Sequence, residues 1–273
     1  MRYFCVKKIK WFLCVIFLLS MLTYNYAYDN NFYNKTSDEF LAYIQNDLTY
    51  FGETFSTKDY ETLIELYKLF ENDLHYASYL PFDKRIIKDK LTNINNFLDC
   101  VMLTGDSYSG NLNRCFVKYY DYKNGLMENA GHTVVENISL YKSAIYSEYP
   151  IIVVSTSVND VLRQTDPRAF KNAIEDLFNS ARLNDKVLIV HSNCNFFVNG
   201  ISANNYDIFY NRPKIYDEII KLTAKKYENV VYVDCKDIAT REYLSSDDIH
   251  YNEKFHFQLA KKIYDAISRY INE

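Results

Sequence analysis

The chain has 273 residues, of which 48% are apolar and six are glycine. This composition excludes a disordered chain or a repeat fibre, and the length suffices for one large domain or for an ordinary domain with an extension. The formal charge is −4, and without residues 1–27 the remaining 27 basic and 35 acidic residues give −8. Binding to a phosphate backbone needs the opposite sign, so nucleic acid is not an expected partner.

Residues 1–27 have the pattern of an export signal, with four basic residues ahead of an apolar stretch at 11–22. That stretch is too short to span a bilayer comfortably. Residues 25–27 match a cleavage site only loosely, so a removed signal peptide and a retained membrane anchor both stay open. The lysines predict an inward-facing N-terminus, with the rest of the chain secreted or held at the outer face of the membrane.

Residues 28–97 predict a helical extension that contains no catalytic motif. Apolar residues recur at helical spacing after Ser37 and again from Tyr60. A third helix is expected from Pro81, because proline is tolerated in a first turn, and its apolar face would contain Ile87, Leu91, Ile94 and Leu98. The extension is expected to cover or precede the catalytic domain, and a partner-binding hairpin is the alternative.

From residue 98 onward, short apolar runs alternate with helical stretches. The runs are mostly rich in β-branched residues and contain no charge, as expected of strands buried on both faces of a parallel sheet. The expected strands are 100–104, 151–155, 187–190 and 230–233. Helices are expected from Asp166-Pro167, over 212–227 and from Asn252. The pattern predicts a three-layer α/β domain over residues 98–273.

Gly105-Asp106-Ser107 directly follows the first expected strand. Ligands of open parallel sheets bind beyond the carboxyl ends of the strands, and this triplet falls at such an end. Glycine lets the backbone turn sharply, so that the Ser107 hydroxyl can point out of the sheet. Taken alone, the triplet is equally compatible with a strand-to-loop turn that has no chemical role.

Asp247-Asp248-Ile249-His250 stands between the last expected strand and the last helix. A serine hydroxyl needs an imidazole within hydrogen-bond reach, itself held in one tautomer by a carboxylate. The spacing allows Asp247 to bond Nδ1 of His250 while Nε2 faces Ser107. Asp248 is the alternative orienting carboxylate.

The other histidines are weaker candidates for the base. His256 has Glu253 three residues upstream, but both are expected within the last helix, where such a pair usually lies on a solvated face. His75, His132 and His191 lack a carboxylate at that spacing and are expected to be structural.

Ser157-Val158-Asn159-Asp160 follows the strand expected over 151–155. The side-chain NH₂ of Asn159 can point at a developing oxyanion, and removing such a donor costs roughly 2.7 to 4 kcal/mol in the transition state. Asn-Asp is also common in turns, so the functional interpretation depends on the two other motifs.

In their order along the chain, the three motifs resemble the SGNH or GDSL hydrolase family, over roughly residues 98–273. The resemblance implies a flavodoxin-like α/β/α sandwich that hydrolyses or transfers an acyl ester through Ser107, His250 and Asp247, with no metal or cofactor. It further implies three oxyanion donors: the backbone N–H of Ser107, the side chain of Asn159, and the backbone N–H of a glycine in a block between them.

The glycine of that block has two placements in this sequence. Gly131 takes the position if 126–127 form a short strand and 132–146 a helix. If 133–138 form the strand instead, Ser139 takes it. The chain also departs from the family pattern at Ser157, where glycine is usual, so the turn is expected to be ordinary or the loop slightly different, because serine is costly at positive φ.

The four cysteines outside the N-terminal segment have no CxxC spacing, so neither a zinc site nor a redox site is expected. Disulfides and buried free thiols both stay open for these residues, which are Cys100, Cys115, Cys194 and Cys235.

The export signal and the family resemblance together predict an exported serine esterase that removes a short acyl group, acetyl above all, from a glycan or another polar carrier. The residues after Ser107 lack the pattern of larger lipases, and no long apolar lid is found. The 27 tyrosines and 18 phenylalanines are weak support for a sugar-binding surface. An O-acyltransferase acting on a surface glycan and a catalytically silent binding protein with the same fold are the alternatives, and the oligomeric state is left open.

Overall fold

The structure, a computed structural model, describes residues 69, 80–91, 96–191, 212–246 and 250–272. The first two helices expected in the extension lie outside this part of the chain, as do the following single residues: His75, Cys194, Asp247 and Asp248. The domain boundaries at residues 27 and 97 stay predictions.

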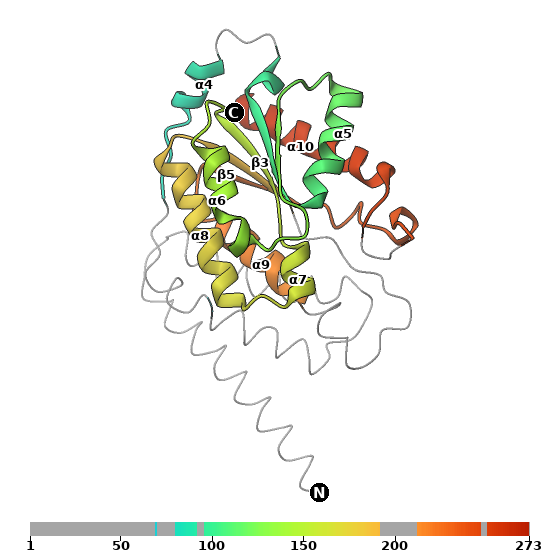
Figure 1. The fold of residues 1–273 in the computed structure, drawn as a ribbon. Helices are drawn as coiled ribbons and strands as arrows, with labels where there is room; N and C mark the ends of the chain where they lie inside the picture. The colour runs from blue at the N-terminus through green and yellow to red at the C-terminus, as the bar shows by residue number, and fades with distance from the viewer. Residues whose placement is uncertain (1–68, 70–79, 92–95, 192–211, 247–249, 273) are drawn as a thin grey trace, which may run out of the picture. The chain divides into compact units, whose positions relative to one another are not determined.

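Five parallel strands form one sheet in the order β2-β1-β3-β4-β5, which is the flavodoxin-like arrangement (Figure 1). The strands are β1 (Val101–Gly105), β2 (Leu126–Glu128), β3 (Ile151–Ser155), β4 (Val187–His191) and β5 (Val230–Val233). The predicted parallel sheet is thereby confirmed.

Helices cover both faces of the sheet, which gives the expected three layers (Figure 1). One face is covered by α5 (Ser107–Tyr120) and α10 (Glu253–Asn272), which pack against each other. The other face is covered by a row of three helices: α6 (Val134–Ile145), α8 (Pro167–Leu183) and α9 (Arg212–Ala224). The short helix α7 (Val158–Arg163) lies at the lower side of Figure 1, beyond the carboxyl end of β3.

The three inner strands carry the core, because every residue of β1, β3 and β4 is buried. The outer strands β2 and β5 are partly exposed. Burial on both faces explains why the inner strands are apolar without alternation. Parallel pairing of β1 with β3 and of β3 with β4 sets their carboxyl ends side by side. The residues that follow these strands are therefore brought to one edge of the sheet.

The observed boundaries of several elements differ from the predicted ones. The helix expected from Pro81 through Leu98 is wrong in its extent: α4 covers Arg85–Leu91, and Leu98 lies in a separate 3₁₀ helix, η1 (Phe97–Cys100). The side chain of Asn96 accepts a bond of 3.1 Å from the Leu98 N–H and so caps this new helix.

The strand expected over 100–104 begins one residue later, because Cys100 ends η1. The helix expected to reach Tyr227 ends at Ala224, and Tyr227 instead forms a bridge with Leu80. Residues from the predicted extension therefore contact the sheet domain directly, since the Leu80 N–H also donates to the Lys226 carbonyl at 2.8 Å.

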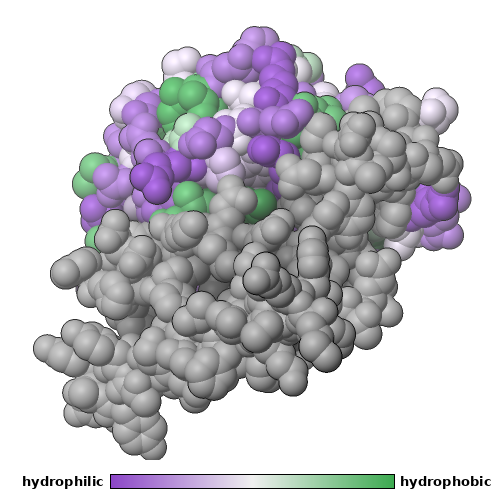
Figure 2. All heavy atoms as spheres, turned by 90° about the horizontal axis from the view of Figure 1, so that it is seen from below, coloured by the Kyte–Doolittle hydropathy of each residue, from purple (hydrophilic) through white to green (hydrophobic). Residues whose placement is uncertain are grey.

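Figure 2 views the molecule from the side on which α7 lies, and hydrophilic residues occupy most of the described surface there, with separate apolar groups between them. Within the described ranges, every helix falls short of the length and apolar character needed to cross a bilayer.

Candidate active site

Gly105 ends β1 in a backbone conformation that residues other than glycine rarely adopt. Its φ is +148°, and a Cβ atom there would lie 2.1 Å from the carbonyl oxygen of Ser155 on the neighbouring strand. The next residue, Asp106, caps α5 by accepting a 3.0 Å bond from the Tyr108 N–H. Ser107 is thus the first residue of α5, where backbone N–H groups have no acceptor within the helix and the helix dipole favours negative charge.

The Ser107 hydroxyl meets an imidazole from 143 residues further along the chain. Its Oγ lies 3.1 Å from Nε2 of His250, and both side chains are only partly buried. Proton transfer between a nucleophile and its base needs a separation of about this size. This contact brings together the serine and the histidine that the sequence singled out.

Backbone bonds hold the His250 segment in place. The Ser245 N–H donates to the His250 carbonyl at 2.7 Å, and the Asn252 N–H donates to the Tyr243 carbonyl at 2.7 Å. The ring of Tyr108, which is buried in α5, lies 6.1 Å from the imidazole ring. His250 is therefore held by the backbone around residues 243–245 and lies beside α5, the helix that bears Ser107. Asp247 and Asp248, the two expected orienting carboxylates, lie outside the described residues.

Asn159 lies in α7, directly beyond the end of β3, and it is half-buried. Its side-chain Nδ2 is enclosed, with no acceptor among the residues that the structure describes. A buried donor left without a partner costs about 1 to 3 kcal/mol. An acceptor supplied by a bound molecule would remove that cost, as an oxyanion would.

The connection between β2 and α6 contains Gly131, whose φ is +78° and whose Cβ position is open. β2 covers Leu126–Glu128 and α6 begins at Val134. This is the strand-then-helix arrangement in which Gly131, and not Ser139, takes the glycine position of the block. The alternative with a strand over 133–138 and Ser139 in the glycine position is wrong. Its residues are helical because Thr133 forms a capping box with Glu136.

Asp160 ties the α7 segment to the start of α6. Both of its carboxylate oxygens accept from the Val134 N–H, at 3.0 and 3.2 Å, and the side chain is fully buried. Burial raises the pKa of Asp160 to about 7, although the bond from Val134 acts in the opposite direction. The sequence indicated no role for Asp160, because its partner, Val134, lies 26 residues away in the chain. The residue fixes Asn159 relative to the Gly131 connection.

Ser157 adopts the left-handed conformation, with φ +86° and ψ −19°. Of the two expectations for this position, the ordinary turn is wrong, because the Ser157 backbone has the positive φ that usually needs glycine. Its hydroxyl donates to the Thr156 carbonyl, and its side chain does not cap α7. A non-glycine residue in this region costs about 1 to 3 kcal/mol, so the surrounding structure holds α7 in place against local strain.

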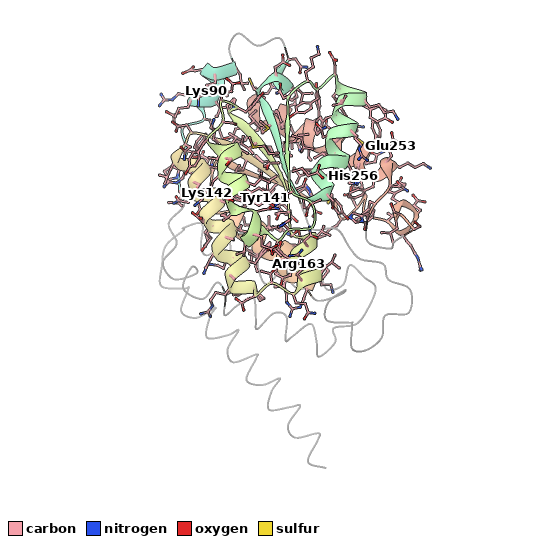
Figure 3. The ribbon with its side chains drawn as sticks, viewed as in Figure 1. Lys90, Tyr141, Lys142, Arg163, Glu253 and His256 are labelled. Atoms are coloured by element: carbon pink, nitrogen blue, oxygen red, sulfur yellow. The ribbon has the colours of Figure 1, made fainter. Side chains whose placement is uncertain are left out.

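His256 and Glu253, both labelled in Figure 3, lie in the first turn of α10 and do not form a pair. Glu253 is exposed and binds Lys118 at 2.5 Å, whereas His256 is 1% exposed and packs on the Tyr108 ring. Burial lowers the pKa of His256 to about 3, so this imidazole is neutral at ordinary pH. The expected solvated face is wrong for His256, because the residue lies on the apolar side of the helix beside Phe255 and Leu259.

His191 ends β4 and is buried next to the site. Its Nε2 lies 3.0 Å from Oγ of Ser155, the residue whose carbonyl oxygen accepts from the Asp106 N–H at 3.2 Å. Burial raises the pKa of Asp106 to about 6, while His191 and His250 act to lower it. These contacts assign His191 to the packing beneath the turn that precedes Ser107. His132, in contrast, is on the surface, where its Nδ1 lies 3.1 Å from the Ala130 carbonyl oxygen.

Within the described ranges, no three Asp, Glu, His or Cys side chains gather as metal ligands. Three of the cysteines are buried free thiols: Cys100, Cys115 and Cys235.

The domain is a three-layer α/β/α sandwich. Ser107 and His250 form a pair beyond the carboxyl ends of its central strands. By sequence, no protein-family model and no curated protein matches the chain. Solved structures do match it. An α/β hydrolase from the metagenome of Lake Arreo, Spain, is 18% identical, with a TM-score of 0.50 over 63% of this chain and 96% of that one.

Two further structures agree. A GDSL-like lipase from Bacteroides thetaiotaomicron is 16% identical, with a TM-score of 0.51 over 68% of this chain and 97% of that one. A mutant of an acetyl-xylooligosaccharide esterase from Geobacillus stearothermophilus is 16% identical, with a TM-score of 0.50 over 61% of this chain and 93% of that one. The chain has the fold of the SGNH hydrolases, as its motifs predicted.

Proposed function

We propose that this protein is a serine esterase of the SGNH type that uses Ser107 as nucleophile, His250 as general base and Asp247 as the carboxylate that orients His250. The observation that carries the proposal is the 3.1 Å approach of the Ser107 Oγ to Nε2 of His250. The two residues are 143 positions apart, and both come from motifs chosen for this chemistry. The SGNH fold, shared with esterases and lipases, supports the same class of reaction.

In the proposed reaction, His250 takes the proton of the Ser107 hydroxyl as its Oγ attacks the ester carbonyl. The tetrahedral intermediate collapses to an acyl-enzyme, and the protonated imidazole returns the proton to the leaving alcohol. A water molecule activated by the same imidazole then hydrolyses the acyl-enzyme. Transfer to a sugar hydroxyl would use the same intermediate and differs only in the acceptor.

The proposed oxyanion site consists of the backbone N–H groups of Ser107 and Gly131 and the side chain of Asn159. The enclosed Nδ2 of Asn159, which has no acceptor among the described residues, supports its part in this site. Asp160 acts here as a positioning residue, because its bonds to the Val134 N–H connect two of the donor-bearing segments.

The proposed role of Asp247 is to bond the second nitrogen of the imidazole. Asp247 lies in sequence between Ser245 and His250, whose backbones are joined by a 2.7 Å hydrogen bond. An orienting carboxylate stabilises the imidazolium that forms when the base takes the proton.

The proposed substrate is a short acyl ester, acetyl above all, on a glycan or another polar carrier outside the cytoplasm. The export pattern of residues 1–27 supports the location, and the fold shared with an acetyl-xylooligosaccharide esterase supports the substrate class. Fractionation of expressing cells tests the location separately. Recovery of the protein in the cytoplasm would contradict the export part alone.

The activity is tested with 4-nitrophenyl acetate and the purified protein. Ser107→Ala and His250→Ala are expected to lower kcat by roughly 10⁴-fold or more, and Asp247→Asn by roughly 10⁴-fold. Ser143→Ala is the control, because Ser143 is an exposed serine on α6. A fluorophosphonate probe is expected to label the wild type and the control but not Ser107→Ala. A folded wild type that hydrolyses no ester and refuses the probe would refute the proposal.

A further inference from the structure

A hollow with aromatic walls lies between the end of α5, the 3₁₀ helix η3 (Arg241–Tyr243) and the start of α10. We call it the aromatic hollow. Its volume is about 320 Å³. Its walls are formed by Lys118, Tyr119, Tyr243, Glu253, Lys254, Phe257 and Gln258.

Three aromatic rings give the hollow an apolar surface open to solvent. Tyr119 is 44% exposed, and its ring meets that of Phe257 edge-on at 4.6 Å and 62°. Tyr243 is half-buried on the η3 side. A sugar ring has an apolar C–H face that packs on aromatic side chains, so the exposed rings suit such a ligand.

Two kinds of polar group surround these rings: groups that bind one another, and groups that are available to a ligand. Glu253 is held by the Lys118 ammonium at 2.5 Å and by the Tyr119 hydroxyl at 3.0 Å, which fixes the Tyr119 ring in place. The side chains of Lys254 and Gln258 make no hydrogen bond within the described part of the chain. The hollow therefore offers a rigid aromatic wall together with an amide and an ammonium that are available to the hydroxyl groups of a ligand.

The aromatic hollow lies close to the candidate active site along the chain. Glu253 follows His250 by three residues, so their Cα atoms are at most about 11 Å apart. Lys118 follows Ser107 by eleven residues of α5, which corresponds to about 16 Å of helix. The hollow is thus too far from Ser107 to hold the ester, yet near enough to hold another part of the same molecule (Figure 3 labels Glu253).

We propose that the aromatic hollow is a subsite for a sugar unit of the acylated glycan, separate from the unit that bears the ester. This inference rests on the proposed function. It adds that the natural substrate is an oligosaccharide or polysaccharide and not a single acylated sugar.

The first test compares two substrates, an acetylated xylo-oligosaccharide and 4-nitrophenyl acetate. In Tyr119→Ala, the ratio of kcat/KM for the oligosaccharide to kcat/KM for the small ester is expected to fall about tenfold, mostly through KM. Tyr119→Phe keeps the ring and is expected to retain most of the ratio. Tyr146→Ala is the control, because Tyr146 is 66% exposed at the end of α6, on the opposite face of the sheet. An unchanged ratio in Tyr119→Ala would overturn the subsite.

The second test measures binding without catalysis, in the Ser107→Ala background. Calorimetry with hexasaccharides of β-1,4-linked xylose, glucose and N-acetylglucosamine is expected to detect at least one complex, which Tyr119→Ala weakens about tenfold. Absence of binding to all three, or equal affinity in both proteins, would overturn the subsite. If the wild type hydrolyses no ester, the proposed function fails while this comparison still decides about the hollow.

Discussion

Replacing Asn159 with alanine removes the one side-chain donor of the proposed oxyanion site. The Nδ2 atom is enclosed and has no acceptor among the described residues, so in the free protein its hydrogen-bonding capacity is unused. An oxyanion that forms next to it would gain a bond that the ground state lacks. Removal of such a donor costs about 2.7 to 4 kcal/mol of transition-state stabilisation, so kcat on 4-nitrophenyl acetate is expected to fall by about 10² to 10³.

The same substitution is expected to leave the folded state no weaker. Truncation of a half-buried side chain loses about 1 kcal/mol of packing, whereas relief of an unpaired buried donor returns about 1 to 3 kcal/mol. The free energy of unfolding of Asn159→Ala should therefore equal or exceed that of the wild type. A residue with a purely structural role would behave in the opposite way, with lower stability and little change in kcat.

Steady-state kinetics and urea unfolding followed by circular dichroism measure the two quantities on the same samples. Asn172→Ala, at an exposed position on α8, serves as the control and should alter neither. A kcat of Asn159→Ala within threefold of the wild type would refute the assignment. So would a kcat loss accompanied by an equal loss of stability, because the defect would then come from misfolding.

Three further predictions concern the backbone and the buried carboxylate. Gly105→Ala should destabilise the fold by about 3 kcal/mol or more in urea unfolding, because its Cβ would lie 2.1 Å from the Ser155 carbonyl oxygen; a loss below 1 kcal/mol would contradict the close approach. Ser157→Gly should raise the free energy of unfolding by about 1 kcal/mol through relief of the positive φ, seen as a higher Tm, and a lower Tm would count against the strain. Asp160 has a pKa raised from 3.8 to about 7 in the folded state, so its contribution to stability is complete below pH 4 and is lost as the pH rises through 7. Asp160→Asn keeps an acceptor for the Val134 N–H but does not titrate, and its stability relative to the wild type should rise by up to about 4 kcal/mol between pH 4 and pH 8; a difference that stays constant over this range would disprove the raised pKa.

Local patterns in the sequence were sufficient to place most of the sheet. The apolar runs that became β3, β4 and β5 were located to within a residue, because an apolar run unbroken by charge is a local signal of a strand in a parallel sheet. The start of α8 at Pro167 was equally visible, since an aspartate cap followed by proline is a local signal. The prediction of the end of α9 failed because the deciding contact, the bridge between Tyr227 and Leu80, is not local.

The sequence alone determined which residue types stand at the ends of the strands, because strand burial and turn chemistry are encoded within a few neighbouring residues. Only the tertiary structure decided how those ends meet: the Ser107 hydroxyl beside His250, the Asp160 carboxylate on the Val134 N–H, and His256 buried beneath Tyr108. The orphaned amide of Asn159 and the left-handed backbone of Ser157 also became visible only there. The contacts between distant residues depend on the order in which the strands pair, and that order is set by packing between segments that are distant in the sequence.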